Sequence, residues 1–312
     1  MVDLRVKIGG TTLKNPVMPA SGTFAEGLSR LFPFDRLGAL VTKTITAELR
    51  DGNPTPRVVE VGQGMLNSIG IPSKGVPYFI ANILPQFEGF SAPLVVSVSA
   101  PTAELFTDIV HQLDLPGITA IEANISCPNL EEDGKAFAML PRSTAAVVEQ
   151  IRRATTRPLW VKLTPNTGDV AAVALAAEQS GADALVVANT ILAMSIDTKS
   201  FRPRLGSLMG GYSGPAIKPI VLRMVYQCAN VVGIPIIGCG GISTVEDAVE
   251  YMLAGATAVQ VGTATFLKPM AMIEIIEGLC AFCEQHDIEQ VSELVGAVRD
   301  SGMNVDRLEA VP

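Results

Sequence analysis

Histidine and aromatic residues are scarce in this chain of 312 residues, which has two histidines, one tryptophan and 5% aromatic residues in total. His111 and His286 both lie in segments with the pattern of outer helices, so we do not expect histidine-based catalysis. Charged residues make up 17%, and acidic residues outnumber basic ones to give a net charge of −8. This balance argues against a broad surface for nucleic acid or for an anionic membrane, although it leaves room for a basic pocket that binds one phosphate.

Long apolar runs and a cysteine framework are also missing. Glycine and proline interrupt the long uncharged stretches, and the N-terminus lacks the apolar core of a signal peptide, so we expect no membrane span and a cytoplasmic protein. Five cysteines in a chain of this length do not make a disulfide framework, and no arrangement of them could hold an iron–sulfur cluster. Cys280 and Cys283 lie in a helical pattern without a second pair or a nearby histidine, which favours packing over metal binding. No metal site is predicted.

Short apolar runs are abundant, and hydrophobic residues make up 48% of the chain. Most of these runs are apolar nearly throughout, as are parallel strands that are buried on both faces. Eight such runs predict eight strands: Val17–Gly22, Ala39–Ile45, Leu94–Ser99, Ala120–Ser126, Leu159–Thr164, Ala184–Thr190, Pro235–Gly241 and Ala258–Thr263.

Segments with helical patterns separate several of these strands. Residues 143–155 repeat apolar residues at helical spacing, and Asp169 is a candidate N-cap for a helix that runs to Gln179. Ser243-Thr-Val-Glu246 predicts a capping box for a helix that ends at Leu253. The alternation of strands and helices predicts an α/β fold, a single (β/α)8 TIM barrel domain over residues 1–312, with an open doubly wound sheet as the competing architecture.

Three segments fall outside the regular alternation. Leu4–Val17, with Gly9-Gly10 in its middle, predicts an N-terminal hairpin that closes the floor of the barrel. The longest intervals between strands follow the second and the sixth strand and predict insertions at roughly 46–80 and 191–215. Both insertions belong to the carboxyl ends of the strands, where barrels of this kind build their active sites.

Two lysines stand inside otherwise apolar strands, Lys43 in Leu-Val-Thr-Lys-Thr and Lys162 in Trp-Val-Lys-Leu. Burying an ammonium group without a polar or anionic partner is costly. We therefore expect both side chains to point into the mouth of the barrel, toward a ligand. The alternative is that they extend to solvent or form salt bridges at the rim.

Glycine-rich turns end the last two strands, at Gly238-Cys-Gly240-Gly241 and at Gly262-Thr263. Such turns let backbone N–H groups approach a phosphate, which is a recurrent site in this fold, although tight turn geometry alone would also explain them. Together with the two lysines they predict a phosphorylated cofactor across the mouth. Flavin mononucleotide (FMN) fits, because a lysine could stabilise negative charge on its reduced ring.

Cys127 comes directly after the fourth strand and is followed by Pro128, with polar residues on either side. A cysteine in this place can act as a base or a nucleophile if its pKa is lowered. It can equally be a small buried residue without a chemical role. The spacing alone leaves both interpretations open.

Four motifs together resemble one known family, dihydroorotate dehydrogenase, and the match runs in consistent order from about Asn15 to Thr265. The membrane-bound class of that family has serine at the position of Cys127, so the resemblance is to the soluble class 1, and within it to the B-type. The motifs are Asn124-Ile-Ser-Cys-Pro-Asn129, Gly52-Asn-Pro-Thr-Pro-Arg57, Gly64-Met-Leu-Asn-Ser-Ile-Gly70 and Gly211-Tyr-Ser-Gly-Pro-Ala-Ile-Lys-Pro219.

The resemblance implies that (S)-dihydroorotate is oxidised to orotate for pyrimidine synthesis, with Cys127 as the base and Lys43 between flavin and substrate. It implies that FMN is bound by Ser21, Lys43, Thr44, Ser97, Asn124, Lys162, Ala188, Gly214, Gly240, Gly241, Gly262 and Thr263. It implies that the substrate is bound by Lys43, Asn67, Ser68, Ile69, Gly70, Ile71, Asn124, Asn129, Asn189 and Thr190.

The B-type resemblance also implies partners. Its members pass electrons to a second subunit that carries FAD and a [2Fe–2S] cluster, and finally to NAD⁺. The family pattern implies a homodimer of this chain within a heterotetramer. The alternatives are an A-type enzyme that uses fumarate, a related flavin-dependent oxidoreductase of another pyrimidine such as uracil, and a flavin-binding paralogue with a structural or regulatory role.

The sequence departs from the family pattern at two places. Ser97 stands where the family usually has an asparagine near the flavin. Residues Lys135-Ala-Phe-Ala-Met-Leu140 stand where the family usually continues with Gly-Thr-Asp after the phenylalanine. The first departure concerns one flavin hydrogen bond and the second concerns how the loop after Cys127 closes and which substrate it prefers.

Overall fold

Eight parallel strands form the centre of the molecule in a computed structural model, which describes residues 2–126 and 136–298. Their order in the sheet is β3-β18-β17-β12-β11-β10-β9-β4. The strands are β3 (Val17–Pro19), β4 (Leu40–Val41), β9 (Leu94–Val98), β10 (Ala120–Asn124), β11 (Leu159–Lys162), β12 (Ala184–Val187), β17 (Ile236–Cys239) and β18 (Ala258–Val261). All eight predicted strands are therefore confirmed.

The two edge strands of this sheet also meet. Gly38 lies two residues before β4, and its N–H group donates a hydrogen bond to the Val17 carbonyl of β3 (2.8 Å). The sheet thus curls into a nearly closed barrel, which confirms the (β/α)8 prediction over the open doubly wound sheet.

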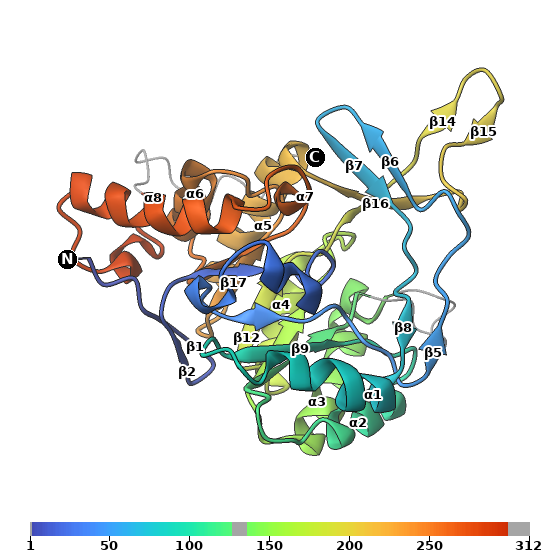
Figure 1. Ribbon diagram of the computed structural model, residues 1–312, viewed down its shortest axis with the longest axis horizontal. Helices are drawn as coiled ribbons and strands as arrows, with labels where there is room; N and C mark the ends of the chain where they lie inside the picture. The colour runs from blue at the N-terminus through green and yellow to red at the C-terminus, as the bar shows by residue number, and fades with distance from the viewer. Residues whose placement is uncertain (1, 127–135, 299–312) are drawn as a thin grey trace.

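Helices cover the outside of the barrel, as Figure 1 shows. They are α2 (Ala103–Gln112), α3 (Pro141–Ala154), α4 (Val170–Gln179), α5 (Lys218–Ala229), α6 (Val245–Leu253) and α8 (Ala271–Gln285), with the short helices α1 (Val76–Tyr78) and α7 (Ala264–Leu267). The buried apolar side chains of strands and helices form one contiguous cluster. No helix within the described part of the chain combines the length and the apolar character needed to cross a bilayer.

The sequence predicts N-caps for two helices, and the structure contains both helices. Asp169 is the N-cap of α4 as predicted, and its carboxylate accepts from the Ala172 N–H group (2.9 Å). The capping box of α6 was placed one residue too early. Thr244, not Ser243, is the N-cap, and its partner is Asp247 rather than Glu246, because the Asp247 carboxylate accepts from the backbone N–H groups of both Ser243 and Thr244.

The N-terminal hairpin is present as β1 (Val6–Ile8) and β2 (Thr11–Leu13), which pair antiparallel. Its turn lies under the barrel, because a Cβ atom added at Gly9 would come within 3.4 Å of Trp160 Nε1 and 2.9 Å of Asp183 Cβ. Trp160 lies near the amino end of β11, and Asp183 directly precedes β12. The hairpin therefore lies at the floor, as predicted.

The two predicted insertions pair with one another. The first contributes β6 (Val58–Val61) and β7 (Gly64–Asn67), and the second contributes β13 (Ile191–Ala193) and β16 (Gly210–Ser213), to one antiparallel sheet in the order β13-β16-β7-β6. Two smaller pairs complete them: β5 (Leu49–Arg50) with β8 (Ser73–Lys74), and β14 (Ile196–Asp197) with β15 (Arg202–Pro203). These strands extend together on one side of the barrel (Figure 1).

Helices α6 and α8 pack closely at Gly278, and this contact generates a stability prediction. A Cβ atom at Gly278 would lie 2.1 Å from Val245 Cγ2. We expect Gly278→Ala to lower the free energy of unfolding by about 1–3 kcal/mol, because the two helices must separate to accept the methyl group. Chemical denaturation measures the change. Gly89→Ala is the control, since nothing lies within 4 Å of a Cβ atom there; equal stability of both variants would contradict the close packing.

Candidate active site

Lys43 lies at an irregularity in the barrel wall. Thr42 N–H donates to the Val95 carbonyl (3.0 Å), and the next bond to β9 comes from Ile45 N–H to the Ser97 carbonyl (2.9 Å). Three residues on one strand thus match two on its neighbour, which is the pattern of a β-bulge. The predicted strand Ala39–Ile45 is therefore too long, since β4 ends at Val41.

The bulge exposes Lys43 to a cavity of about 290 Å³, whose wall includes Lys43, Thr44 and Tyr78. Burial lowers the pKa of the Lys43 ammonium group. Among the described residues, Lys43 forms neither an ion pair nor a hydrogen bond. A partly desolvated cation of this kind is suited to an anionic ligand.

Lys162 ends β11 and points into the interior of the barrel, where it is only 4% exposed. Its Nζ atom lies 3.2 Å from Gln260 Oε1 and 3.4 Å from Ser21 Oγ. Burial alone would lower the pKa of Lys162, but Cys239 and Glu122 outweigh that effect and raise it. Burial raises the pKa of the Cys239 thiol, and Lys162 beside it partly opposes that rise.

A continuous set of buried side chains connects Lys162 with the opposite wall. Gln260 Nε2 donates to Glu122 Oε2 (2.6 Å), Ser97 Oγ donates to Glu122 Oε1 (2.9 Å), and Ser97 Oγ lies 2.9 Å from Thr44 Oγ1. Glu122, Gln260 and Ser97 are each fully buried. Polar groups from five barrel segments thus meet in the interior, and we name Thr44, Ser97, Glu122, Gln260 and Lys162 the interior network.

Amide side chains gather at the ends of β10 and β12. Asn189 Nδ2 lies 3.4 Å from Asn124 Oδ1 and also donates to Ser126 Oγ, while Ser126 Oγ donates to Asn124 Oδ1 (2.5 Å). Thr190 N–H donates in turn to Asn189 Oδ1 (2.8 Å). The structure therefore brings together Asn124, Asn189 and Thr190, as the sequence predicts.

The inserted sheet brings Asn67 to the same place. Asn67 Nδ2 donates to the Gly211 carbonyl (3.1 Å), and Thr190 packs directly against Gly211, where an added Cβ atom would be 1.9 Å from Thr190 Oγ1. Asn67 comes from the first insertion and Gly211 from the second. The pairing of the two insertions thus positions Asn67 beside the ends of the barrel strands.

The segment 67–71 is held by the motif at 52–57. Asn53 Nδ2 donates to Ser68 Oγ (2.7 Å), Asn53 N–H donates to the Ile69 carbonyl (3.1 Å), and Ser68 N–H donates to the Arg57 carbonyl (2.8 Å). Gly70 and Ile71 both have positive φ angles, so the chain turns sharply at the end of this segment. These contacts make 67–71 a fixed wall beside the site.

The predicted phosphate turns converge as well. A Cβ atom at Gly241 would lie 2.8 Å from the Gly214 carbonyl and 2.9 Å from Lys218 N, and Thr263 Oγ1 donates to Ser213 Oγ (2.8 Å). Gly241 has a φ angle of 72°, a conformation that side chains rarely adopt. Gly214, Gly240, Gly241 and Thr263 therefore line one cradle, which Gly262 adjoins.

Donor groups in this cradle fit a phosphate. The backbone N–H groups of Gly241, Ile242 and Thr263 donate to no acceptor within residues 2–126 and 136–298. Ile242 is buried and Gly241 and Thr263 are half-buried, so three unused donors lie together in a partly closed place, which suits an anion.

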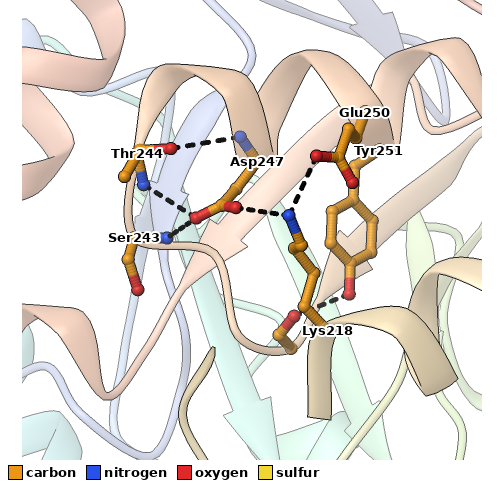
Figure 2. A network of polar contacts seen from close by, with 7 residues as sticks. Lys218, Ser243, Thr244, Asp247, Glu250 and Tyr251 are labelled. Atoms are coloured by element: carbon orange, nitrogen blue, oxygen red, sulfur yellow. Dashed lines mark hydrogen bonds and ion pairs between the residues drawn. The ribbon is translucent and has the colours of Figure 1, made fainter. Parts of the chain in front are cut away.

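Side chains of helices α5 and α6 form a polar network next to the cradle, and Figure 2 shows Lys218, Asp247, Glu250 and Tyr251 in it. Tyr251 OH donates to the Gly240 carbonyl (2.6 Å). Lys218 Nζ contacts both Asp247 Oδ1 (2.8 Å) and Glu250 Oε1 (2.9 Å), and these contacts, that with Asp247 first, raise its pKa. Lys218 is thus neutralised by its own neighbours, and the backbone donors are left to bind the phosphate.

Two predicted residues, Cys127 and Asn129, lie outside the described residues. Ser126 and Asn124, which precede them, are in place in the amide cluster. Ala188 is buried next to the interior network, where its N–H group donates to the Cys239 carbonyl (3.0 Å). In the segment 135–140, which differs from the family pattern, Phe137 is buried and packs edge-on against Phe106.

Sequence reasoning missed Glu122, Gln260 and Tyr251. For the first two the signal was available, since a carboxylate in Ala-Ile-Glu-Ala-Asn and an amide in Ala-Val-Gln-Val interrupt strands that are otherwise apolar. Tyr251 gave no such signal, because a tyrosine at an apolar helix position indicates only packing. Its role depends on the contact with Gly240, which lies in a different segment.

Comparison with known proteins places these residues in one family. The sequence profile described as "Dihydroorotate dehydrogenase" matches residues 3–282. A protein from Pelobacter propionicus is 46% identical over 299 residues, covering 95% of this chain and 98% of its own length. A protein from Bacteroides fragilis is 45% identical over 303 residues (96% and 99%), and one from Thermoanaerobacter sp. (strain X514) is 43% identical over 300 residues (96% and 99%). Each is named "Dihydroorotate dehydrogenase B (NAD(+)), catalytic subunit".

Proposed function

The chain belongs to the dihydroorotate dehydrogenase family, and from this premise we propose that it is the catalytic subunit of a B-type enzyme that oxidises (S)-dihydroorotate to orotate. The single observation that carries this proposal is the convergence of Lys43, the amide cluster and the phosphate cradle on one barrel mouth. The family is flavin-dependent, and the proposal assigns FMN as the flavin.

The fit of FMN to these residues rests on two separate features. The orphaned N–H groups of Gly241, Ile242 and Thr263 suit its phosphate, with Gly214, Gly240 and Gly262 beside them. Lys162, Ser21, Thr44 and Ser97 offer buried polar groups for the flavin ring. A flavin without a phosphate would leave the first feature without a function. Ala188 and Asn124 complete the assigned set.

When bound, FMN supplies a two-electron acceptor for the hydride at C6 of the substrate. Cys127 takes the proton from C5 and holds it as a thiol. Lys43 stabilises the negative charge that develops in this partly dry chamber. Splitting the task in this way needs no histidine, which agrees with the scarcity of that residue.

The amide cluster suits the substrate. Dihydroorotate is a neutral ring with alternating N–H and C=O groups and one carboxylate, so it needs amide donors and acceptors together with a cation. Asn67, Asn124, Asn129 and Asn189, with Thr190, supply the former, and Lys43 the latter. The segment 67–71 covers the substrate with backbone groups. A uracil reductase would have no use for a carboxylate-binding cation.

The electrons must leave to an acceptor outside this chain, because no cysteine arrangement in the sequence could hold an iron–sulfur cluster. The relatives are named catalytic subunits of NAD⁺-linked enzymes. We therefore propose a partner subunit with FAD and a [2Fe–2S] cluster, and a homodimer of this chain inside a heterotetramer. An A-type enzyme that uses fumarate is the second candidate.

Anaerobic stopped-flow mixing of the flavin-loaded chain with dihydroorotate tests this function. We expect the flavin absorbance near 450 nm (a generic flavin band, roughly placed) to bleach rapidly. Reoxidation only after addition of the electron-transfer subunit supports the B-type, and reoxidation by fumarate alone supports the A-type. A yellow protein that dihydroorotate fails to bleach would overturn the assignment of the substrate.

Cys127→Ala tests the base. We expect flavin content to stay normal and flavin reduction by dihydroorotate to slow by about 10²–10⁴-fold at neutral pH, because a positioned base contributes about this much. The measurement is the same stopped-flow experiment. Cys283→Ala, a change at a buried thiol in α8, is the control. Near-normal reduction in Cys127→Ala would refute the assignment.

Tyr251→Phe tests the cradle. Without its hydroxyl group the Gly240 carbonyl loses its partner, and we expect the affinity for FMN to fall about tenfold, equivalent to about 1.4 kcal/mol. Affinity for riboflavin, which lacks the phosphate, should not change. Fluorescence titration of the apoprotein measures both, with Tyr226→Phe as the matched control. An equal loss for both ligands would mean that Tyr251 supports the fold and not the phosphate turn.

A further inference from the structure

Glu122 is a buried carboxylate for which the reaction as described has no use. It is fully buried, and it forms no ion pair with any described residue. Its two oxygens accept from neutral donors, Gln260 Nε2 (2.6 Å) and Ser97 Oγ (2.9 Å). Burying a charge in this way is costly, and a neutral side chain of the same shape could fill the space.

A carboxylate fixes which of its neighbours donate and which accept in the hydrogen bonds around it. An ionised carboxylate can only accept hydrogen bonds, so Gln260 must turn its NH₂ group toward Glu122. The amide oxygen of Gln260 then faces the other way, where it accepts from Lys162 Nζ (3.2 Å). The ammonium group of Lys162 is thereby held in one position inside the barrel.

The same constraint acts on the other side of Glu122. Ser97 must donate its only hydroxyl proton to Glu122, so its oxygen is left to accept from Thr44 Oγ1, 2.9 Å away. Thr44 has then used its proton as well and presents only lone pairs to the mouth. The interior network thus offers an acceptor at Thr44 and a donor at Lys162.

We propose that Glu122 is a positioning residue which fixes the hydrogen-bond direction of the interior network and, through Gln260 and Lys162, sets the reduction potential of the bound flavin. This inference rests on the proposed function, because it needs a flavin at the mouth. It goes beyond that function by assigning a role to two side chains that contact neither the substrate nor the phosphate cradle.

The sign of the effect follows from the charges. Glu122 partly offsets the positive charge of Lys162 and binds it, by way of Gln260, to the barrel interior. A reduced flavin carries more negative charge than an oxidised one, so a freed and uncompensated lysine favours the reduced form. Removing the carboxylate should therefore shift the potential to more positive values.

The experiment compares Glu122→Gln with the unchanged flavin-loaded chain in an anaerobic dithionite titration with a reference dye. We expect the preference for reduced over oxidised flavin to rise at least tenfold, which is about 30 mV for a two-electron couple. The control is Glu178→Gln. Glu178 also accepts two N–H bonds, from Gly233 (2.8 Å) and Ile234 (3.1 Å), but it lies at the end of α4.

A second variant separates positioning from a simple effect of charge. Gln260→Met keeps the carboxylate and removes both hydrogen bonds that link it to Lys162. We expect a shift of the same sign as in Glu122→Gln. An unchanged potential in Gln260→Met would overturn the positioning role, as would an unchanged potential in Glu122→Gln. This second variant also serves as the test if Glu122→Gln does not fold.

These outcomes are independent of the proposed substrate. Dithionite reduces the flavin whether or not dihydroorotate does, so a shifted potential supports the inference even if stopped-flow mixing shows no bleaching. Conversely, rapid bleaching by dihydroorotate with unchanged potentials in both variants would keep the proposed function and refute the role of Glu122. A merely structural role would change the unfolding temperature and leave the potential unchanged.

Discussion

A lysine buried inside a barrel needs hydrogen-bond acceptors and a compensating negative charge, and the architecture of this site depends on that constraint. Lys162 is almost fully buried, and an ammonium group there is stable only if its protons meet acceptors. Gln260 and Ser21 supply these acceptors. Glu122, which is hydrogen-bonded to Gln260, supplies the compensating charge. Because these groups come from different strands, the barrel must close for the lysine to be satisfied. The bond from Gly38 to Val17, which joins the edge strands, helps to hold the barrel closed around these groups.

The mouth depends on a second constraint, which is that two insertions far apart in the chain form one sheet. β7 pairs with β16, and this pairing carries Asn67 to Gly211 and so to Thr190 at the end of the barrel. The amide cluster at Asn124 and Asn189 is built on barrel strands and does not need the insertions. The site thus has a rigid half formed by the barrel and a half formed by the inserted sheet, and its shape is set by how the two meet.

The sequence was sufficient for the strands, the hairpin, the location of both insertions and the glycine cradle, because each depends on local pattern. Lys43 and Lys162 were found because a charge in an apolar strand is a strong signal. Periodicity did not predict where the strands end: the bulge at Lys43 and Thr44 depends on register with β9, which a single strand does not encode. The α6 cap was misplaced by one residue because Ser243 and Thr244 are both good caps, and only the position of Asp247 selects between them. Tyr251 could not be found at all, since its partner is a carbonyl in another segment.

Ser97 illustrates how a departure from a family pattern can be absorbed. Its hydroxyl group donates to Glu122 and lies 2.9 Å from Thr44 Oγ1, and its backbone N–H group donates to Thr42 Oγ1 (3.1 Å). Because its only hydroxyl proton goes to Glu122, this side chain can offer a cofactor a lone pair but no donor. In the proposed network Ser97 also acts on the flavin through Thr44, whose lone pairs remain free. An asparagine is longer and carries two N–H donors, so it could bond to Glu122 and still reach outward. The serine thus replaces an outward donor by a hydrogen bond with Thr44. In the proposed network, Glu122 then sets the direction of the hydrogen bonds on both sides of it, at Ser97 and at Gln260.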